Sequence, residues 1–205
     1  MYSKSGNRIL YGNSLSNIIY KVMDLPTPET IIEFWFAPQH RKLWFNSSAE
    51  FDQLIRDQFE TTWQAATAGQ LQHWQQTATG CLALAIVLDQ FPLNMYRGQA
   101  KSFSTETQAI TVTKHALQQG FDKQLPIEQL AFLYLPLMHS EQLADQELSL
   151  QLFSAAGLKE NLRFAQHHRD LIARFGRFPH RNAMLGRDST EEEIAYLNSK
   201  QAFKG

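Results

Sequence analysis

Helix start and stop signals recur along most of the chain, and they constrain its fold more than any other feature of the sequence. Thr27 precedes a proline and an acidic residue, an order typical of an N-cap, a first helical position and a first turn. Ser47 and Glu50 have the spacing of a capping box, and apolar residues then recur with a helical period until Gly69. No segment alternates apolar and polar residues between hairpin turns, as a half-buried strand does. The sequence therefore predicts an all-helical protein.

The most apolar stretch runs from Ala78 to Gln90. It could form a buried strand, but its length and its many alanines favour a buried central helix. We expect a turn-rich connection from Phe91 to Ser104, followed by further helices. The first of these ends at Gly120, and the second runs from Pro126 into Pro136. The third begins after a Ser140 cap and ends at Gly157, the fourth runs from Leu158 to Phe175, and the last follows a capping box at Ser189 and Glu192. Neighbouring helices with short connections predict a right-handed stack of antiparallel helix hairpins.

Composition excludes several classes of function. Against 20 Asp and Glu, 19 Lys and Arg give 205 residues a formal net charge of −1, which argues against nucleic-acid binding through a basic surface. The single cysteine, Cys81, excludes an internal disulfide framework and any site built from several cysteines. No apolar run approaches the roughly 18 residues of a membrane span. We therefore expect residues 25–205 to form a single cytoplasmic domain with no nucleic-acid or membrane partner.

The first 24 residues differ from the rest of the chain. They are rich in Ser, Asn and Tyr, and Gly12 and Asn13 interrupt the continuous apolar core that a secretory signal requires. We expect residues 1–24 to be a poorly ordered N-terminal extension, or a translated leader ahead of a natural start at Met23.

Three polar segments carry more chemistry than helix connections require. The first follows the apolar stretch, where Asp89 and Gln90 lead into a connection that contains Arg97. A carboxylate at the end of so apolar a segment must find hydrogen-bond donors, because burying an unpaired charge is costly. Asp89 is then either a structural group that holds the following loop, through backbone amides or Arg97, or a functional group in a site.

The second polar segment is the joint between two expected helices. We expect Pro136 to end or kink one helix and Ser140 to cap the next, which places His139 and Glu141 in a tight joint. The free amides in the first turn of a helix attract anions. Glu141 in that turn would compete with such a ligand, and compensation of the helix dipole alone would explain its presence.

The third polar segment begins on the helix expected from Leu158. His168 shares a helix face with Phe164 and other apolar residues, so we expect it to point toward the core. Beyond Gly176, the turn presents Arg177, His180, Arg181 and Asn182. Arginine forks match carboxylate and phosphate oxygens, and histidine donates, accepts or binds metal near pH 7. Alternatively, these arginines pair with carboxylates such as Asp89, Glu141, Asp145 and Asp170, and hold the helix pairs together.

Several blocks of the sequence resemble the bacterial family catalogued as domain of unknown function 924. The blocks are Phe34-Trp35-Phe36 with Trp44-Phe45, Asp89-Gln90-Phe91-Pro92 with Tyr96-Arg97-Gly98, Tyr134-Leu135-Pro136 with His139-Ser140-Glu141, His168-Arg169-Asp170 with residues 174–182, and Leu185-Gly186-Arg187 with residues 189–192. The resemblance spans residues 26–197 and implies an all-helical fold similar to tetratricopeptide-repeat proteins, with no assigned activity. Leu93 departs from the family pattern, in which a basic residue is usual, and this weakens any site that needs positive charge there. The family pattern begins near Met23, which favours the leader interpretation.

These residues predict a polar ligand site on a helical scaffold. The candidate binding residues are Asp89, Gln90, Arg97, His139, Glu141, His168, Arg177, His180, Arg181 and Asn182. We expect a small anionic or zwitterionic ligand, with arginines on its acidic groups and Asp89 or Glu141 on an amine.

Two other functions remain open. A hydrolase-type enzyme could hold a metal ion with His139, Glu141, His168 and His180, or could use His168 or His180 as a base oriented by Asp89 or Glu141. The tight ligand spacing of a metal-binding helix is absent, and the sequence indicates no particular cofactor. A protein–protein adaptor is the third hypothesis, by analogy with repeat folds.

Overall fold

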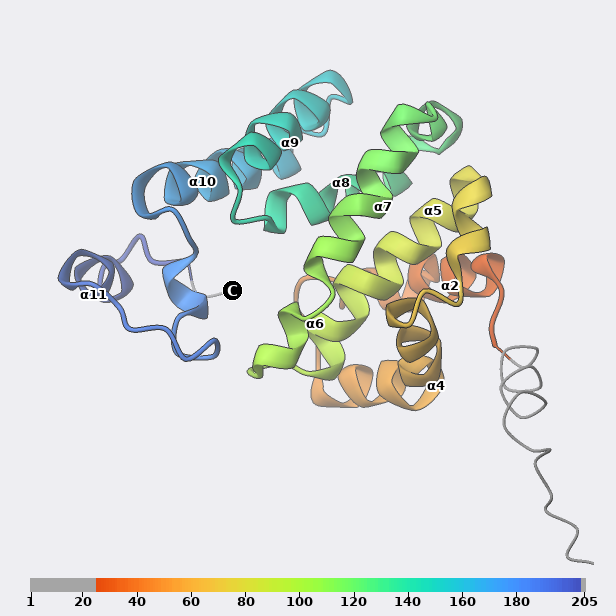
Figure 1. Ribbon diagram of the computed structural model, residues 1–205, viewed down its shortest axis with the longest axis horizontal. Helices are drawn as coiled ribbons and strands as arrows, with labels where there is room; N and C mark the ends of the chain where they lie inside the picture. Colours follow the sequence, from red (N-terminus) through yellow and green to blue (C-terminus); the bar gives the residue numbers. More distant parts are fainter. Residues whose placement is uncertain (1–24, 204–205) are drawn as a thin grey trace, which may run out of the picture.

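The computed structural model describes residues 25–203 and shows helices, with no strand, over this part of the chain. The expectations for residues 1–24 lie outside the described residues. Figure 1 shows the elements, which are α2 (Pro28–Phe36), α3 (Pro38–Arg41), α4 (Ala49–Thr67), η1 (Gln72–Gln76), α5 (Ala78–Ala85), η2 (Ile86–Gln90), α6 (Phe91–Met95), η3 (Ala100–Phe103), α7 (Glu106–Gln118), η4 (Phe121–Gln124), α8 (Ile127–His139), α9 (Leu143–Ala155), α10 (Lys159–Phe175), η5 (Pro179–Arg181) and α11 (Glu191–Leu197). The predicted all-helical class is confirmed.

Helices that follow one another pack together in the second half of the protein. The neighbouring pairs α7 with α8, α8 with α9, and α9 with α10 are all in contact, as expected for stacked hairpins. In the first half the order is different, because α5 packs against both α2 and α7, while α4 packs against α6 (Figure 1). A right-handed, tetratricopeptide-like superhelix stays a prediction.

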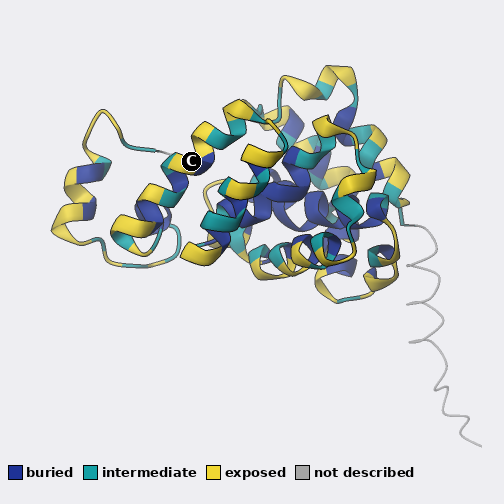
Figure 2. Ribbon diagram, turned by 90° about the horizontal axis from the view of Figure 1, so that it is seen from above, coloured by how far each residue is buried: buried dark blue, intermediate teal, exposed yellow. Residues whose placement is uncertain are grey.

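The core has a large part and a small part. The large part surrounds α5, whose residues are almost all buried, and Figure 2 shows it as the dark interior of the broader end of the molecule. The small part lies at the C-terminal end and consists of Leu171, Ile172, Phe178 and Tyr196. Leu171 and Ile172 lie on α10, which packs against α9, so this helix pair attaches the small part to the rest of the molecule. That residues 25–205 form one domain stays a prediction.

Three helix N-caps test the predicted start signals. Thr27 caps α2 as predicted, since its hydroxyl accepts a hydrogen bond from the Thr30 amide. Both predicted caps are wrong by one residue, because Ser48 caps α4 in place of Ser47, and Thr190 caps α11 in place of Ser189. The capping box of α11 is formed by Thr190 and Glu193, whereas α4 has none, because Phe51 follows Ser48 at the position where a box needs an acidic or amide side chain.

The predicted turn-rich connection after Gln90 is wrong, because the helix continues through Pro92 to Met95. Proline has no N–H to donate to the carbonyl four residues earlier, which here belongs to Leu88. The Thr105 hydroxyl donates to this carbonyl instead, at 2.6 Å. The prolonged run is therefore stabilised by a side chain from the next segment of the chain.

The prolonged run also corrects the expectation about membrane spans. Residues Ala78–Met95 form an 18-residue window with a mean hydropathy of 1.3, long and apolar enough to cross a membrane by length and composition. Within the protein 83% of this window is buried. It therefore has the surroundings of a core helix, and a cytoplasmic location stays a prediction.

Candidate functional site

A π-helical turn, η2, places Asp89 and Gln90 inside the protein. Single π-turns are uncommon and are frequent at functional sites. Both side chains are buried, and the Gln90 amide donates to Asp89 Oδ2 at 2.5 Å. The expectation that this carboxylate must find donors is met within the fold.

The second partner of Asp89 is His139, the last residue of α8. The His139 Nδ1 atom lies 2.8 Å from Asp89 Oδ1 and 3.0 Å from Oδ2. An ionised carboxylate only accepts hydrogen bonds, so Nδ1 carries a proton, and in the neutral form of the ring the lone pair is on Nε2. Within residues 25–203 Nε2 has no hydrogen-bond partner, and the His139 side chain is 17% exposed. The pair thus engages Nδ1 alone and leaves Nε2 of a partly exposed side chain available to a ligand.

The joint between α8 and α9 differs from its prediction. The helix α8 does not end at Pro136 but continues to His139, and Ser140 is its C-cap. Because α9 begins only at Leu143, the expectations that Ser140 caps α9 and that Glu141 lies in its first turn are wrong. The Ser140 hydroxyl instead donates to Asp145 at 2.8 Å. Glu141 therefore does not occupy the first turn of α9, and an anion site in that turn stays a prediction.

Glu141 instead holds the C-terminal segment. Its carboxylate accepts the backbone N–H of Phe178 at 2.8 Å and both terminal nitrogens of Arg187, at 2.6 and 2.9 Å. Burial alone would raise the pKa of Glu141, but the Arg187 and Phe178 hydrogen bonds outweigh it and lower that pKa. Glu141 is thus a charged partner that connects the α8–α9 joint to the segment after α10.

Arg181 makes a second connection across the same joint. Its Nη1 donates to Glu106 at 2.7 Å and its Nη2 donates to the His139 carbonyl at 3.0 Å. The guanidinium lies between two aromatic rings, 4.6 Å from the Phe103 centroid and 4.5 Å from that of Phe178. Burial raises the pKa of Glu106 although Arg181 is its partner. The backbone of His139 is therefore fixed by the C-terminal segment.

The other two candidate histidines, His168 and His180, are near neighbours of His139. His168 is buried as predicted, and its Nδ1 donates to the Phe164 carbonyl at 2.8 Å, but Phe164 itself is 45% exposed and not on a core face. The rings of His168 and His180 lie 4.6 and 5.1 Å from that of Phe203. Burial is the main cause that lowers the pKa of His168 to about 3 and that of His180 to about 4. Both are therefore neutral near pH 7.

Two buried nitrogens at the joint have no hydrogen-bond partner among the described residues. They are His180 Nδ1 and Arg181 Nε. Buried polar atoms are nearly always paired, so such atoms need an explanation. Together with His139 Nε2, they give the joint three nitrogen atoms that have no partner within residues 25–203.

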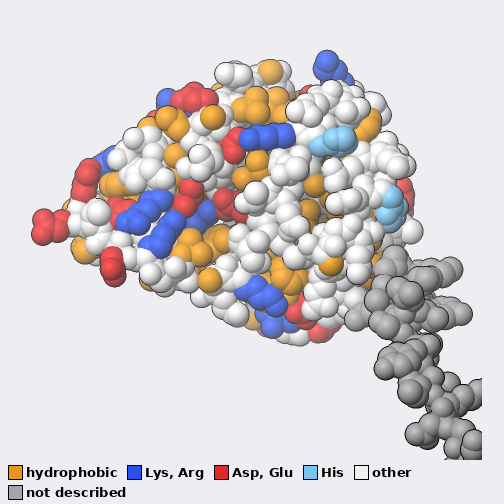
Figure 3. All heavy atoms as spheres, in the orientation of Figure 1, with side chains coloured by type: hydrophobic (Ala, Val, Ile, Leu, Met, Phe, Trp, Pro, Cys, Tyr) orange, Lys and Arg blue, Asp and Glu red, His pale blue; other side chains and the backbone are white. Residues whose placement is uncertain are grey.

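Two of the predicted arginines, Arg97 and Arg177, form ion pairs with residues outside the group around His139. Arg97 is largely exposed and pairs with Asp52 at 2.8 Å, away from Asp89. Arg177 donates to both carboxylate oxygens of Glu193, at 2.7 and 2.8 Å, and this contact lowers the pKa of Glu193 to about 2. The remaining candidates share one network of contacts and near neighbours around the joint, namely Asp89, Gln90, His139, Glu141, His168, His180, Arg181 and Asn182. Figure 3 shows basic and acidic side chains intermixed on the C-terminal part of the molecule.

Comparison with known proteins now places the chain. A family model described as a bacterial protein of unknown function (DUF924) matches residues 31–201. The chain belongs to this family. A solved structure of a protein of unknown function from Agrobacterium tumefaciens is 37% identical, with a TM-score of 0.80 over 83% of this chain and 96% of that one. No match is found among curated proteins. The resemblance inferred from the sequence blocks is confirmed, and neither description states an activity.

The geometry of this DUF924 protein gives three of the four candidate metal ligands other partners. In the part of the chain that the structure describes, no three His, Cys, Asp or Glu side chains are grouped so that they could hold a metal ion. His139 Nδ1 is bound to Asp89, Glu141 to Arg187, and His168 Nδ1 to a backbone carbonyl. A metal site made of His139, Glu141, His168 and His180 is therefore not formed.

Two residues that hold other side chains of the site in place were not predicted from the sequence. Glu106, the first residue of α7, receives Arg181, and Arg187 holds Glu141. Arg187 lies in a block that resembles the family, so the resemblance offered a signal for it. Glu106 offered none, because an acidic residue in a first helical turn is ordinary.

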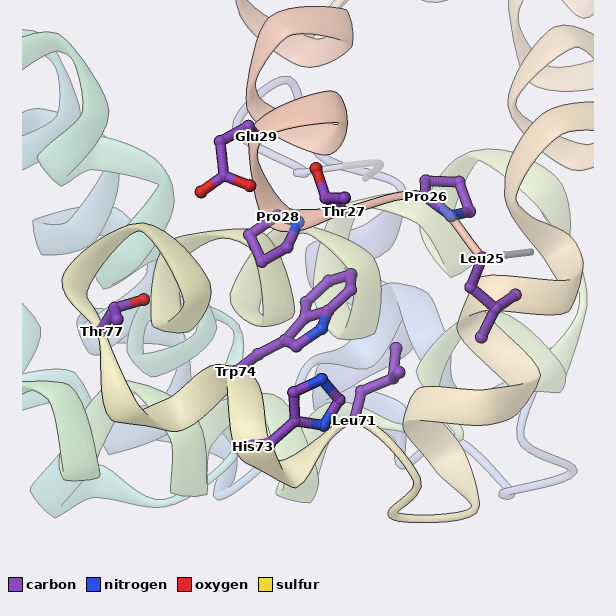
Figure 4. A pocket seen from close by; sticks show the side chains of 9 residues that line it. All are labelled: Leu25, Pro26, Thr27, Pro28, Glu29, Leu71, His73, Trp74 and Thr77. Atoms are coloured by element: carbon purple, nitrogen blue, oxygen red, sulfur yellow. The ribbon is translucent and has the colours of Figure 1, made fainter. Parts of the chain in front are cut away.

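A recess of about 380 Å³ lies elsewhere, between the start of α2 and η1. Figure 4 shows Trp74, His73 and Leu71 on one side of it, and Pro28 and Leu25 on the other. None of the ten candidate binding residues lines it. The polar joint and this recess are therefore separate features.

Proposed function

We propose that this DUF924 protein binds a small anionic or zwitterionic ligand at the joint around His139. The observation that carries the proposal is the Asp89–His139 pair, which leaves Nε2 of a partly exposed His139 side chain without a partner among the described residues. The buried, unsatisfied nitrogens of His180 and Arg181 lie at the same joint and support it. A ligand with acceptor and donor groups would satisfy atoms that otherwise remain unpaired.

Of the two ligand classes, the charges around the joint favour a zwitterion over a simple anion. Arg181 is neutralised by Glu106, and Arg187 by Glu141. A simple anion would have to compete with these carboxylates for their arginines. A zwitterion can add its acidic group to a guanidinium and its amine to a carboxylate, which leaves the net charge of the joint unchanged.

The hypothesis of an adaptor has less support from the geometry. An adaptor of the repeat type needs a long binding groove along several helices. The polar contacts described above gather instead where the α8–α9 joint meets η5 and the following loop. This concentration favours a compact site for a small molecule.

Native mass spectrometry of the protein as purified tests the proposal. The comparison uses the wild type, His139→Gln, and Arg97→Gln as a matched control, since Arg97 lies on a separate contact with Asp52. We expect an added mass on the wild type and on Arg97→Gln that His139→Gln lacks. Glycine and acetate, followed through the histidine side-chain ¹⁵N signals, then separate a zwitterion from an anion. The same mass in all three proteins, with no saturable change in the His139 signals, would contradict the proposal.

A further inference from the structure

We infer that His139 is a general base toward water and that Asp89 is its positioning residue, an inference that rests on the proposed binding site at His139. The pair has the arrangement that such a base needs. A carboxylate that accepts from Nδ1 fixes the tautomer, keeps Nε2 free of a proton, and stabilises the imidazolium that forms when Nε2 takes one.

The fold holds both members of this pair rigidly. Asp89 is buried in the π-turn, and the Gln90 amide orients the carboxylate by donating to it. His139 ends α8, and Arg181 holds its carbonyl. Because the C-terminal end of a helix carries partial negative charge, this position also favours a transient positive charge on the ring.

Water is the O–H group that this nitrogen can reach. Within residues 25–203 no side chain hydroxyl or thiol donates to Nε2. The neighbouring Ser140 hydroxyl is already bound to Asp145, and burial raises the pKa of the Cys81 thiol to about 11, so neither acts as a nucleophile beside it. The partly exposed ring leaves Nε2 open to solvent.

We test this base on the hydrolysis of a small activated acyl compound, because that reaction needs no reactant besides water. Nε2 accepts a proton from water, and the oxygen of that water attacks the acyl carbon. The bond from this carbon to the leaving group then breaks, and the proton on Nε2 passes to the leaving group or to solvent. The products are an acid and the released alcohol, and no oxidant, reductant or second substrate is consumed.

The hydrolysis of p-nitrophenyl acetate by the purified protein tests the inference through release of p-nitrophenolate. We expect His139→Gln to abolish the protein-dependent rate of hydrolysis. Asp89→Asn should lower this rate by about a hundredfold, since an amide at this position permits the tautomer with its proton on Nε2. The exposed His73 provides the control, and His73→Gln should keep the wild-type rate. The wild type should react more slowly in deuterium oxide, because a proton moves in the rate-determining step.

Two measurements on the wild type keep the inference testable if Asp89→Asn fails to fold. In the neutral form of the ring, the ¹⁵N spectrum of the histidine side chains should show the His139 proton on Nδ1 and not on Nε2. A rate unchanged in His139→Gln, an equal rate in deuterium oxide, or a neutral ring with its proton on Nε2 would each overturn the general-base role. If the native mass is present without hydrolysis, this inference fails and the proposed function stands. If hydrolysis depends on His139 but the native mass and the probe-induced changes are absent, the proposed function fails.

Discussion

The two histidines that pack beside Phe203 should make the folded protein sensitive to mild acid. The pKa of His168 falls from 6.5 to about 3, and that of His180 falls from 6.5 to about 4, with burial as the largest cause for both. The folded protein therefore keeps both rings neutral, while the unfolded chain binds protons below about pH 6.5. This contribution to stability is present above pH 6.5 and is lost as the pH falls toward 4 and then 3.

The size of the loss follows from proton linkage. Each extra proton bound by the unfolded chain lowers the free energy of unfolding by about 1.4 kcal/mol per pH unit. Between pH 6.5 and 4.5 each histidine therefore removes roughly 2–3 kcal/mol, and the pair roughly 5 kcal/mol. Because a domain is stable by only about 5–15 kcal/mol, the wild type should be close to unfolding at pH 4.5.

Urea unfolding at pH 7.5 and at pH 4.5, followed by far-ultraviolet circular dichroism, measures this loss. His168→Gln removes one titrating group and keeps a donor for the Phe164 carbonyl, so its loss between the two pH values should be smaller by about 2–3 kcal/mol. In the control His73→Gln the histidine is exposed, and the loss should equal that of the wild type. An equal loss in His168→Gln and in the wild type would refute the reasoning.

Three further substitutions test the contacts that build the fold and the joint. Gly80→Ala should destabilise the protein by about 3 kcal/mol in urea unfolding, because its new Cβ would lie 1.9 Å from the Trp74 carbonyl oxygen; a normal stability would show that this packing is wrong. Thr105→Val should lower the free energy of unfolding by about 2 kcal/mol, because the Leu88 carbonyl above Pro92 loses its donor; an unchanged midpoint of denaturation contradicts this. Glu141→Gln should cost about 2 kcal/mol and increase proteolysis after α10, since it weakens the contact to the C-terminal segment; limited trypsin digestion with no faster cleavage there argues against it.

Local signals in the sequence were sufficient to predict the class of the fold. Caps, glycine stops and the helical period depend on residues a few positions apart, and these predicted the helices well. Two caps, at Ser48 and Thr190, differ from the prediction by one residue for local reasons, whereas the end of the apolar helix depended on a distant side chain. The helix passes Pro92 because Thr105, 17 residues later, donates to the Leu88 carbonyl, and no local pattern contains that contact.

In the candidate site, too, the sequence predicted which residues take part but not which distant residues they contact. A buried carboxylate at Asp89 predicts that a donor exists, but it does not say which donor. The structure supplies His139, 50 residues away, and it pairs Arg181 with Glu106 across 75 residues. The sequence therefore named most members of the joint, while their pairing depended on how α7, α8 and the C-terminal segment pack.

The pairing also decides which residues can act on a ligand. Arg181 and Arg187 donate to carboxylates and backbone carbonyls, so their first effect is to hold the C-terminal segment against the α8–α9 joint. Substituting either arginine should lower stability and ligand binding together. Among the described residues only Nδ1 of the His139 side chain has a hydrogen-bond partner, so His139→Asn, whose amide can donate to buried Asp89 in place of Nδ1, should lose binding with a smaller loss of stability than either arginine variant. If substitution of His139 lowers ligand binding much more than stability, while substitution of Arg187 lowers both together, His139 is the binding residue and Arg187 belongs to the contacts that position it.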